Sequence, residues 1–333
     1  MTSARPLETI QDLVNQIPGA RPGKLSDAPQ PELAKLVERP PEGDEWLHEI
    51  KLDGYRAFCL IEGGVARLVS RRGLALTDSF PRVAVAAAKL PVRTALLDGE
   101  VAVLVPGGRT SFHALQNATG GRVNGELVYF AFDLLHLDGT NLCNASLDDR
   151  KRVLQRVVPA KGVVRYTPHI IGGGPEMFAN ACKLGLEGII SKRRDAAYRG
   201  GRSRCWLKSK CTYQQEFVVV GYTTSDAGAS FGALLLGVHD ERGQLVYVGR
   251  AGTGFSAKEL IEIGRALKKM ERKDPPFVGK RPGPARVMRW VEPMLVVEVR
   301  FTEWTEDGCL RHPSFLGVRL DKDPKEVVRE RPG

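Results

Sequence analysis

The sequence feature that most constrains the fold is the hexapeptide Lys51-Leu52-Asp53-Gly54-Tyr55-Arg56. It follows the stretch 46–50, and its last two residues begin the stretch 55–61. Both stretches have the composition of buried strands. The pattern K-x-D-G-x-R therefore places a lysine at the end of one strand and an arginine near the start of the next. Such a lysine can act as an amine nucleophile, provided that the rest of the chain supplies the groups that it needs.

The length of the chain predicts two domains, because 333 residues exceed what one compact core usually organises. Hydrophobic and charged residues make up 42% and 26% of the sequence, which are ordinary fractions for a globular protein. The composition of the sequence changes after residue 212, where segments rich in Val, Leu and Tyr begin. We therefore expect one domain over residues 1–211, with an extended lead-in rich in Pro and Gly, and a second domain over residues 212–333.

The positive charge of the chain is concentrated in one segment. The net charge is +10, and residues 192–210 hold eight Lys or Arg side chains against the single acid Asp195. A surface that is basic only for solubility would not gather its charge in this way. The pattern indicates a polyanionic partner such as nucleic acid.

The six cysteines do not predict a zinc site, because the chain has no C-x-x-C pair and no histidine cluster beside them. Cys59 and Cys182 lie in apolar stretches, and we expect them to pack as small hydrophobic side chains. Neither an apolar signal region nor a run of about 18 apolar residues occurs. These features predict a cytoplasmic protein with reduced thiols and no membrane association.

Short strands and a few helices are expected in the first domain, which indicates an α+β fold. Ser146 and Asp149 form a capping-box pattern before one helix, and Gly185 ends another. The strand candidates are residues 46–50, 55–61, 66–70, 95–105, 127–135, 188–192 and 205–210, and the helix candidates are residues 7–16, 79–90, 147–158 and 175–184.

The second domain is predicted to be mostly β-structure. Its strand candidates are residues 216–222, 233–240, 244–250 and 294–302. A single helix is expected over residues 257–270, with Ser256 and Glu259 as its capping box. About five strands and one helix in a domain of this size predict a small barrel of the OB type.

A lysine nucleophile needs three kinds of partner. It is weak while protonated and becomes effective when burial or neighbouring cations lower its pKa. A nucleotide phosphate is a suitable electrophile, because Mg²⁺ and basic side chains can spread its charge. The site should therefore hold carboxylates for a metal, cations for the phosphate and an aromatic face for the base.

Residues of all three kinds occur at the predicted strands. Taken alone, the acids are equally consistent with turns, the lysines with a solvated strand face and the aromatic residue with a core position. Asp133 fits simple packing less well, since a buried carboxylate needs a partner. The candidates are the acids Glu100 and Glu187, the cations Lys208 and Lys210, which strand alternation places on one face, and the aromatic residue Phe132.

In order and spacing, these segments resemble the motifs of the ATP-dependent DNA ligases of the covalent nucleotidyltransferase superfamily. They are most similar to the ligase module of bacterial multifunctional end-joining ligases, and the resemblance covers residues 46–329. The matching motifs are Lys51 to Arg56 with Glu49 before it, Ser70-Arg71-Arg72-Gly73, residues 97–100, 131–139, Glu187-Gly188, residues 206–210, and residues 311–322 with Arg319-Leu320-Asp321-Lys322.

The resemblance implies a nucleotidyltransferase fold, an ATP-grasp-like ligase core of antiparallel sheets with flanking helices, followed by a C-terminal OB-fold β-barrel. Lys51 would be the nucleophile that carries AMP, and Asp53, Lys208 and Lys210 would complete the catalytic set. Mg²⁺, or alternatively Mn²⁺, would be bound by Glu100 and Glu187. The residues implied to contact ATP are Glu49, Arg56, Arg71, Glu100, Phe132, Arg319 and Lys322.

The implied activity is the sealing of 3′-hydroxyl/5′-phosphate breaks in DNA, in repair or end joining. Lys51 would take AMP from ATP, pass it to the 5′-phosphate, and the 3′-hydroxyl would then displace it. The second domain would close over the site for the first step and open for DNA. The implied partners are nicked or broken double-stranded DNA and the Ku end-binding protein, with the enzyme acting as a nucleoid-associated monomer. Phosphate contacts are expected from Arg71, Arg193, Arg194, Arg204, Lys280 and Arg281.

Two alternatives remain open at this point. An RNA ligase or an mRNA-capping guanylyltransferase would share the lysine motif and the two-domain plan, although residues 311–322 favour a ligase. A non-catalytic DNA-end-binding module would share the basic surface, although the intact set of Lys51, Glu100, Glu187 and Lys208 argues against it. The chain lacks the zinc finger of NAD-dependent ligases, which favours ATP.

Overall fold

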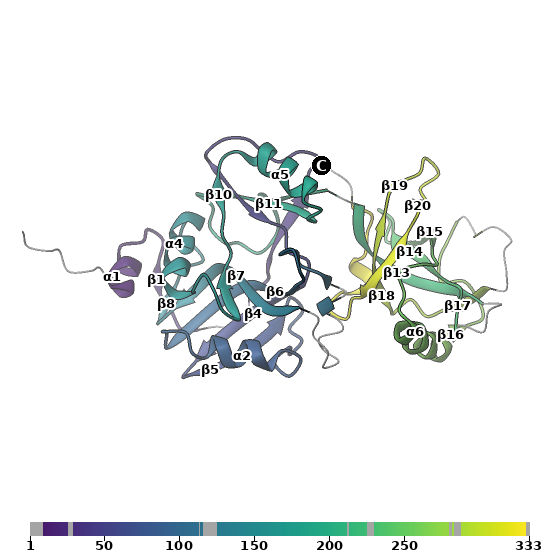
Figure 1. The fold of residues 1–333 in the computed structure, drawn as a ribbon, viewed down its shortest axis with the longest axis horizontal. Coiled ribbons are helices and arrows are strands. Elements are labelled where there is room, and N and C mark those ends of the chain that lie inside the picture. The colour runs from purple at the N-terminus through teal and green to yellow at the C-terminus, as the bar shows by residue number, and fades with distance from the viewer. Residues whose placement is uncertain are drawn as a thin grey trace, which may run out of the picture. The chain divides into compact units, whose positions relative to one another are not determined.

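The computed structural model of the protein describes residues 9–25, 29–112, 114–115, 125–211, 213–224, 230–279, 282 and 288–330. The chain divides into two compact units, Met1–Cys211 and Thr212–Arg331. The first unit contains two β-sheets with helices against them, and the second contains a seven-stranded sheet, a separate two-stranded pair and one long helix (Figure 1). In the described part of the chain, every helix is too short or too polar to span a bilayer.

The first sheet of unit 1 packs one of its faces against the main hydrophobic core. Its antiparallel strands run in the order β1 (Arg21–Pro22), β8 (Thr140–Asn141), β7 (Glu126–Leu137), β6 (Thr94–Leu104), β4 (Tyr55–Glu62) and β5 (Val65–Ser70), with β9 (Val164–Tyr166) parallel to β7. On one face α2 (Pro81–Ala87) contacts β4 and β5, α4 (Leu147–Val157) contacts β7, and α1 (Ile10–Asn15) lies against α4 (Figure 1). Cys59, Leu97 and Tyr129 are fully buried between this face and the helices.

Helix α4 begins where the sequence predicts it to begin. The Ser146 hydroxyl accepts a hydrogen bond from the backbone N–H of Asp149 and so satisfies one of the unpaired donors of the first turn. Val153, Leu154 and Val157 are buried on the face toward the sheet. This helix also buries two cations, Arg150 and Lys151, which is unusual and is explained by the polar groups beneath them.

The second sheet of unit 1 carries the lysine-rich strands. Its order is β10 (Ile170–Ile171), β3 (Trp46–Ile50), β11 (Gly188–Arg193), β12 (Gly201–Lys210) and β2 (Glu32–Leu36). Helix α5 (Gly174–Lys183) lies beside β3 and β11 (Figure 1). Strand β2 belongs to the expected lead-in, where no strand was predicted, and it pairs in parallel with β12.

A small apolar cluster joins the two sheets of unit 1. Phe58 and Leu96 from the first sheet pack with Trp206 from the second, and Phe132 is half-buried against them. The faces that meet at this cluster are opposite to the faces that the helices cover. Polar side chains near this cluster are therefore held between two sheets rather than exposed on an open surface.

Unit 2 is one sheet of mostly antiparallel strands. Its order is β15 (Leu245–Ala251), β14 (Ala233–His239), β13 (Tyr213–Thr223), β17 (Met288–Val291) and β16 (Glu271–Arg272), with β18 (Val296–Phe301) pairing with both β13 and β21 (Ser314–Val318). The hairpin of β19 (Glu303–Trp304) and β20 (Leu310–Arg311) forms a separate pair, and the short 3-10 helix Pro324–Glu326 follows near the end.

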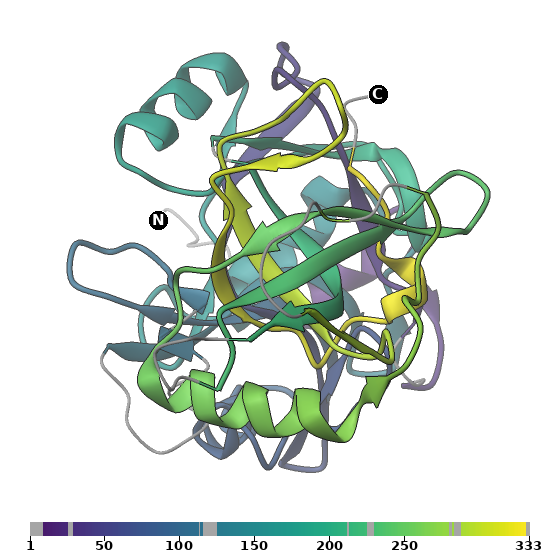
Figure 2. The same cartoon turned by 90° about the vertical axis from the view of Figure 1, so that its right-hand side faces the viewer.

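Helix α6 (Ala257–Lys269) packs against the core of unit 2 through Ile263 and Leu267, and Figure 2 shows it running along the strands. The predicted capping box of Ser256 and Glu259 is present at its start. The expected fold class is confirmed, with one difference in detail. Among the described residues, the strand pairings of unit 2 do not close into a barrel.

One prediction about the cysteines is wrong. Cys182 does not pack as a reduced hydrophobic side chain, because it is joined by a disulfide to Cys211. The two residues lie 29 positions apart in the sequence, but the fold brings their Cα atoms to 5.1 Å, a separation that a disulfide can span. Cys59 is a buried free thiol, as expected.

Candidate active site

Lys51 lies at the end of β3, beside the start of β11. Its backbone N–H donates to the carbonyl of Gly188 at 2.9 Å, which continues the pairing of Ile50 with Ile189. Its Nζ atom lies 2.5 Å from Oε1 of Glu187, and the two side chains are 22% and 7% exposed. Neighbouring strand ends therefore bring together two residues that are separated by 136 positions in the sequence (51 to 187).

The ion pair controls the protonation of Lys51. Burial by itself would lower the pKa of this lysine, but the carboxylate of Glu187, together with smaller contributions from Asp53 and Glu100, outweighs burial and raises the pKa above its usual value. Lys51 is thus an ammonium in this structure. It becomes a nucleophile only when it gives up its proton and its contact with Glu187.

The turn after Lys51 fits only the residues that it contains. A Cβ on Gly54 would lie 2.1 Å from the carbonyl oxygen of Val101, so any larger residue would force β4 away from β6. Asp53 anchors the turn, because its backbone N–H donates to the Thr110 hydroxyl and its carboxylate accepts from the N–H of Phe112. The turn thereby directs Arg56 toward the same inner face as Glu100, its partner across β4 and β6.

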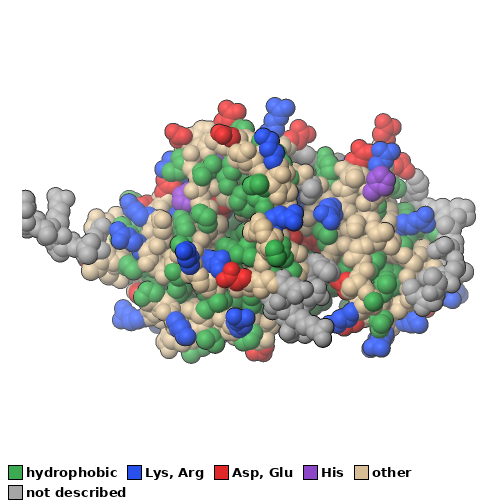
Figure 3. All heavy atoms as spheres, in the orientation of Figure 1, with side chains coloured by type: hydrophobic (Ala, Val, Ile, Leu, Met, Phe, Trp, Pro, Cys, Tyr) green, Lys and Arg blue, Asp and Glu red, His purple; other side chains and the backbone are tan. Residues whose placement is uncertain are grey.

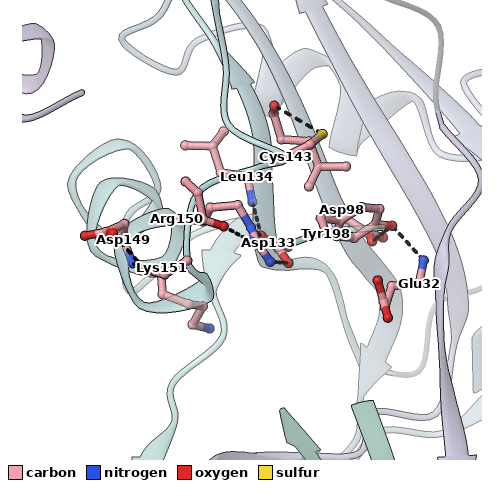
Figure 4. Close-up of polar contacts among 12 residues, drawn as sticks. Glu32, Asp98, Asp133, Leu134, Cys143, Asp149, Arg150, Lys151 and Tyr198 are labelled. Atoms are coloured by element: carbon pink, nitrogen blue, oxygen red, sulfur yellow. Dashed lines mark hydrogen bonds and ion pairs between the residues drawn. The ribbon is translucent and has the colours of Figure 1, made fainter. Parts of the chain in front are cut away.

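Arg56 is held by a network that reaches the N-terminal strand. Asp98 accepts from Nε of Arg56 at 3.0 Å and from Nη2 at 2.6 Å. The Tyr198 hydroxyl donates to Asp98 at 2.8 Å and accepts from the backbone N–H of Glu32 at 3.0 Å, as Figure 4 shows. Arg56 also donates to the carbonyl of Glu32 at 2.5 Å. The sequence reasoning missed Tyr198 and Glu32, and assigned Asp98 only to a motif.

Asp133 has the buried partner that its position requires. Arg150 of α4 donates two hydrogen bonds to it, at 2.7 Å from Nε and 2.9 Å from Nη2 (Figure 4), and both side chains are essentially inaccessible to solvent. Burial alone would raise the pKa of Asp133, but Arg150 outweighs it and lowers the pKa. This pair fixes α4 on β7.

Glu49 is shared by two lysines beside the aromatic residues. Lys151 Nζ lies 2.5 Å from one of its carboxylate oxygens and Lys192 Nζ lies 2.7 Å from the other. Lys192 Nζ is also 4.3 Å from the ring centre of Phe132 and 4.0 Å from that of Trp206. The aromatic face predicted for a base thus lies beside a buried cation, and neither Lys151 nor Lys192 was among the predicted site residues.

Lys208 and Lys210 lie on the strand next to Glu187. The β11–β12 register pairs Lys208 with Ile190 and Lys210 with Gly188, so alternation places both lysines on the same face as Trp206, which lies opposite Lys192. Both side chains are half-buried. Strand ends from both sheets therefore collect Lys51, Arg56, Glu100, Glu187 and these two lysines around one region of unit 1.

Two protein-family models match this chain and decide which family it belongs to. Residues 24–210 match the family model for the ATP dependent DNA ligase domain, and residues 227–322 match the ATP dependent DNA ligase C terminal region. The chain belongs to the ATP-dependent DNA ligase family. This membership disfavours the RNA ligase, capping-enzyme and non-catalytic alternatives.

Its relatives include larger ligases. The chain is 40% identical over 310 residues to the multifunctional non-homologous end joining protein LigD of Pseudomonas aeruginosa, covering 91% of this chain and 36% of the relative. It is 39% identical over 295 residues to the corresponding LigD of Mycobacterium tuberculosis, covering 87% and 38%. The chain thus spans little more than a third of the length of these two LigD relatives.

A solved structure supports the same assignment. The mycobacterial DNA ligase D complexed with ATP and MES is 36% identical, with a TM-score of 0.67 over 90% of this chain and 98% of that chain. The family model that residues 24–210 match is likewise described as ATP dependent.

A divalent metal fits the donors at Lys51, although within the described ranges no three His, Cys, Asp or Glu side chains cluster as a ready-made metal site. The Oε2 atom of Glu187 is buried and has no hydrogen-bond partner among the residues that the structure describes. A buried carboxylate oxygen in this state is suited to a hard cation, which prefers oxygen ligands. Glu187 therefore fits its predicted metal role, and Glu100 is the second acid close enough to influence Lys51.

The predicted DNA-contacting residues lie in different environments. Arg193 pairs with Asp195 and stacks on Trp46, whereas Arg194 pairs with Asp148. Arg71 directly follows β5, and Arg204 is exposed on β12. Lys280 and Arg281 lie outside the described residues.

In unit 2, the predicted phosphate-binding residues are already paired. Arg319 contacts Glu298 at 2.5 Å and Asp321 at 2.8 Å, and its side chain is only 10% exposed. Lys322 contacts Glu216 at 2.7 Å. Burial would raise the pKa of Asp321, but Arg319 lowers it.

Proposed function

We propose that this chain seals 3′-hydroxyl/5′-phosphate breaks in double-stranded DNA through an AMP carried on Lys51. The observation that carries the proposal is the position of Lys51 Nζ, 2.5 Å from Glu187, at a strand end that also gathers Arg56, Glu100 and Lys208. This arrangement occurs in a chain whose residues 24–210 match the ligase catalytic domain.

In the first step, Lys51 attacks the α-phosphate of ATP, which forms a P–N bond and breaks the bond to pyrophosphate. Lys51 must first separate from Glu187 and release its proton. Lys208 and Lys210 neutralise the charge on the phosphate as the bond forms. Phe132 stacks on the base, Glu49 lies within reach of the base edge, and Arg56, held by Asp98, binds the ribose.

We propose that Mg²⁺, or Mn²⁺ in its place, is held by Glu187 and Glu100 when the nucleotide is present. Such an ion supplies positive charge that favours attack on a phosphate. An attraction between the ion and Glu187 also weakens the hold of that carboxylate on Lys51. Proton release and nucleotide binding are thereby linked at the same side chain.

The later steps need further residues of this chain. Arg71 meets the 5′-phosphate of the break, and Arg193, Arg194 and Arg204, together with Lys280 and Arg281, contact the DNA backbone without reading its sequence. Arg319 and Lys322 orient the pyrophosphate when unit 2 closes over the site. That role requires them to exchange part of their contacts with Glu298 and Glu216 for phosphate contacts.

We also propose that the chain acts as a monomer at the nucleoid, in the end joining for which its relatives LigD are named, at DNA ends held by Ku. Joining of linear DNA should then increase when Ku is added, while sealing of a nick should not. Equal stimulation of both reactions, or of neither, would contradict the link to end joining.

The proposed activity is tested with the purified chain, ATP and Mg²⁺ on a nicked DNA duplex. We expect a sealed strand with ATP and none with NAD⁺ or GTP. The matched substrate carries RNA on both sides of the nick and should be sealed far more slowly. Efficient sealing of the RNA substrate, or no sealing of DNA by protein that folds normally, would overturn the proposal.

A further inference from the structure

The cysteine pair Cys182–Cys211 links helix α5 to the end of strand β12 in unit 1. Cys182 lies in the last turn of α5, and Cys211 directly follows β12. Both residues are partly exposed. The other four cysteines, Cys59, Cys143, Cys205 and Cys309, are thiols that take part in no disulfide.

The bond encloses part of the candidate active site. The segment between the two cysteines contains Glu187, Lys208 and Lys210. The backbone N–H of Cys211 donates to the carbonyl of Glu187 at 2.9 Å, and the next pair along the ladder is Gly188 with Lys210. The disulfide therefore closes a covalent ring around the β11–β12 hairpin, at the end where the acid and the lysine lie.

The same bond fixes the exit of the chain from unit 1. Cys211 is the last residue of this unit before unit 2 begins. With free thiols, residue 211 would keep its backbone hydrogen bond to Glu187, which opens more easily than a covalent bond. With the disulfide, it is tied to α5, which packs on β11 and β3. Any motion that starts at this junction is then restricted to residues beyond 211.

We propose that Cys182 and Cys211 are a peroxide-sensitive thiol pair whose reversible disulfide clamps the end of β12 to α5 and slows DNA sealing. One thiolate attacks hydrogen peroxide, which gives a sulfenic acid and releases hydroxide that is protonated to water. The second thiol displaces the sulfenic hydroxyl as water and forms the S–S bond. Two electrons pass from the thiols to the peroxide, and a dithiol reductant reverses the bond by exchange.

The expected effect on activity rests on the proposed function. The hairpin keeps its pairing in the oxidised form, so that Glu187 and Lys210 stay beside Lys51 and adenylation of Lys51 should change little. Sealing requires unit 2 to move between the ATP step and the DNA step, and the clamp restricts the junction where that motion starts. Oxidation should therefore slow sealing more than adenylation.

The thiol chemistry is tested on the full chain without reference to ligase activity. The protein is treated with hydrogen peroxide, free thiols are blocked with an alkylating reagent, and linked peptides are mapped by mass spectrometry before and after dithiothreitol. We expect a Cys182–Cys211 linked peptide that disappears on reduction, and a melting temperature about 5 °C higher in the oxidised form. The absence of that peptide, or a bond that dithiothreitol does not open, would overturn the proposal.

Cys182→Ser and the matched variant Cys205→Ser separate the clamp from general oxidation. Cys205 is a partly exposed free thiol on β12, within the enclosed segment. Peroxide should slow nick sealing several-fold in the wild type and in Cys205→Ser, with adenylation nearly unchanged, and should leave Cys182→Ser unaffected. Equal slowing of Cys182→Ser, or a linked wild type that seals at full rate, would contradict the clamp.

Discussion

Lys51 Nζ lies 2.5 Å from Oε1 of Glu187, in an ion pair that only the meeting of two strand ends makes possible. The pair holds the proposed nucleophile in its protonated form, because burial lowers the pKa of Lys51 by less than Glu187, Asp53 and Glu100 together raise it. Glu187 also has a second oxygen that is buried without a hydrogen-bond partner among the described residues. One carboxylate therefore restrains the lysine and offers an open ligand position for a cation.

Replacing Glu187 should make the enzyme depend more strongly on added metal. In Glu187→Gln, the concentration of Mg²⁺ that gives half the maximal adenylation rate should rise about 10-fold or more, since an oxygen ligand loses its charge. The measurement is a Mg²⁺ titration of AMP transfer to the protein. Glu176→Gln, at an exposed position on α5, is the control and should behave as the wild type. An unchanged Mg²⁺ requirement in Glu187→Gln would exclude Glu187 as a ligand.

Tyr198 should position Arg56 for the nucleotide. Tyr198→Phe removes the hydroxyl that donates to Asp98 and accepts from Glu32, which should cost about 1–3 kcal/mol of the free energy of unfolding. Because Arg56 then loses its second support, we expect the KM for ATP to rise more than kcat falls. Tyr213→Phe, an exposed phenol on unit 2, serves as the matched control. A loss of stability with an unchanged KM would show that Tyr198 has a structural role alone.

The buried pair of Asp133 and Arg150 should matter more than an exposed pair on the same helix. Arg150→Met leaves Asp133 buried without its partner and should lower the free energy of unfolding by about 3–5 kcal/mol. Arg152→Met, which breaks the exposed contact with Asp149, should cost no more than about 1 kcal/mol. Urea unfolding of both variants checks the contrast, and equal losses would contradict it.

The free energy of unfolding should decrease in acid, because the carboxylates of Asp133 and Asp321 are each paired with an arginine in the folded chain. The pKa values of Asp133 and Asp321 are lowered in the folded chain, so the unfolded chain binds more protons as the pH falls. Their contribution is fully present above the ordinary carboxyl pKa and is lost as the pH drops through the lowered values, starting below about pH 5. Urea unfolding between pH 3 and pH 7 should show this loss (about pH 5 downward). Asp133→Asn should be less stable at neutral pH but should lose less on acidification. Parallel pH curves for the two proteins would argue against this assignment.

The strands of the first domain could be predicted well, because their apolar runs are short and bounded by turn residues. Strand β3 has the bounds expected from residues 46–50, and β4, β5 and β11 differ by one residue at an end. Strand β2 was missed for a physical reason. It has no alternating pattern, since four of its five residues are half-buried, and it pairs in parallel with a strand far away in the sequence.

The site residues could be predicted only where they belong to a short sequence motif with a recognisable chemical role. Lys51, Glu187 and Lys208 belong to short motifs, and the structure places all three at neighbouring strand ends. Tyr198 and Lys151 could not be found in this way, because their partners Asp98 and Glu49 lie 100 and 102 positions away. The disulfide of Cys182 was missed for the same reason. The sequence shows which cysteines exist, and only the fold shows which two meet.

The most direct test of the account is to locate the AMP. The chain is incubated with ATP and Mg²⁺, digested, and its peptides are sequenced by mass spectrometry, with a parallel sample pretreated with pyrophosphate to remove any AMP already bound. The account predicts one AMP on Lys51, none in Lys51→Arg, and an unchanged adduct in Lys89→Ala, which alters an exposed lysine. An AMP on another residue, or normal labelling of Lys51→Arg, would contradict the account.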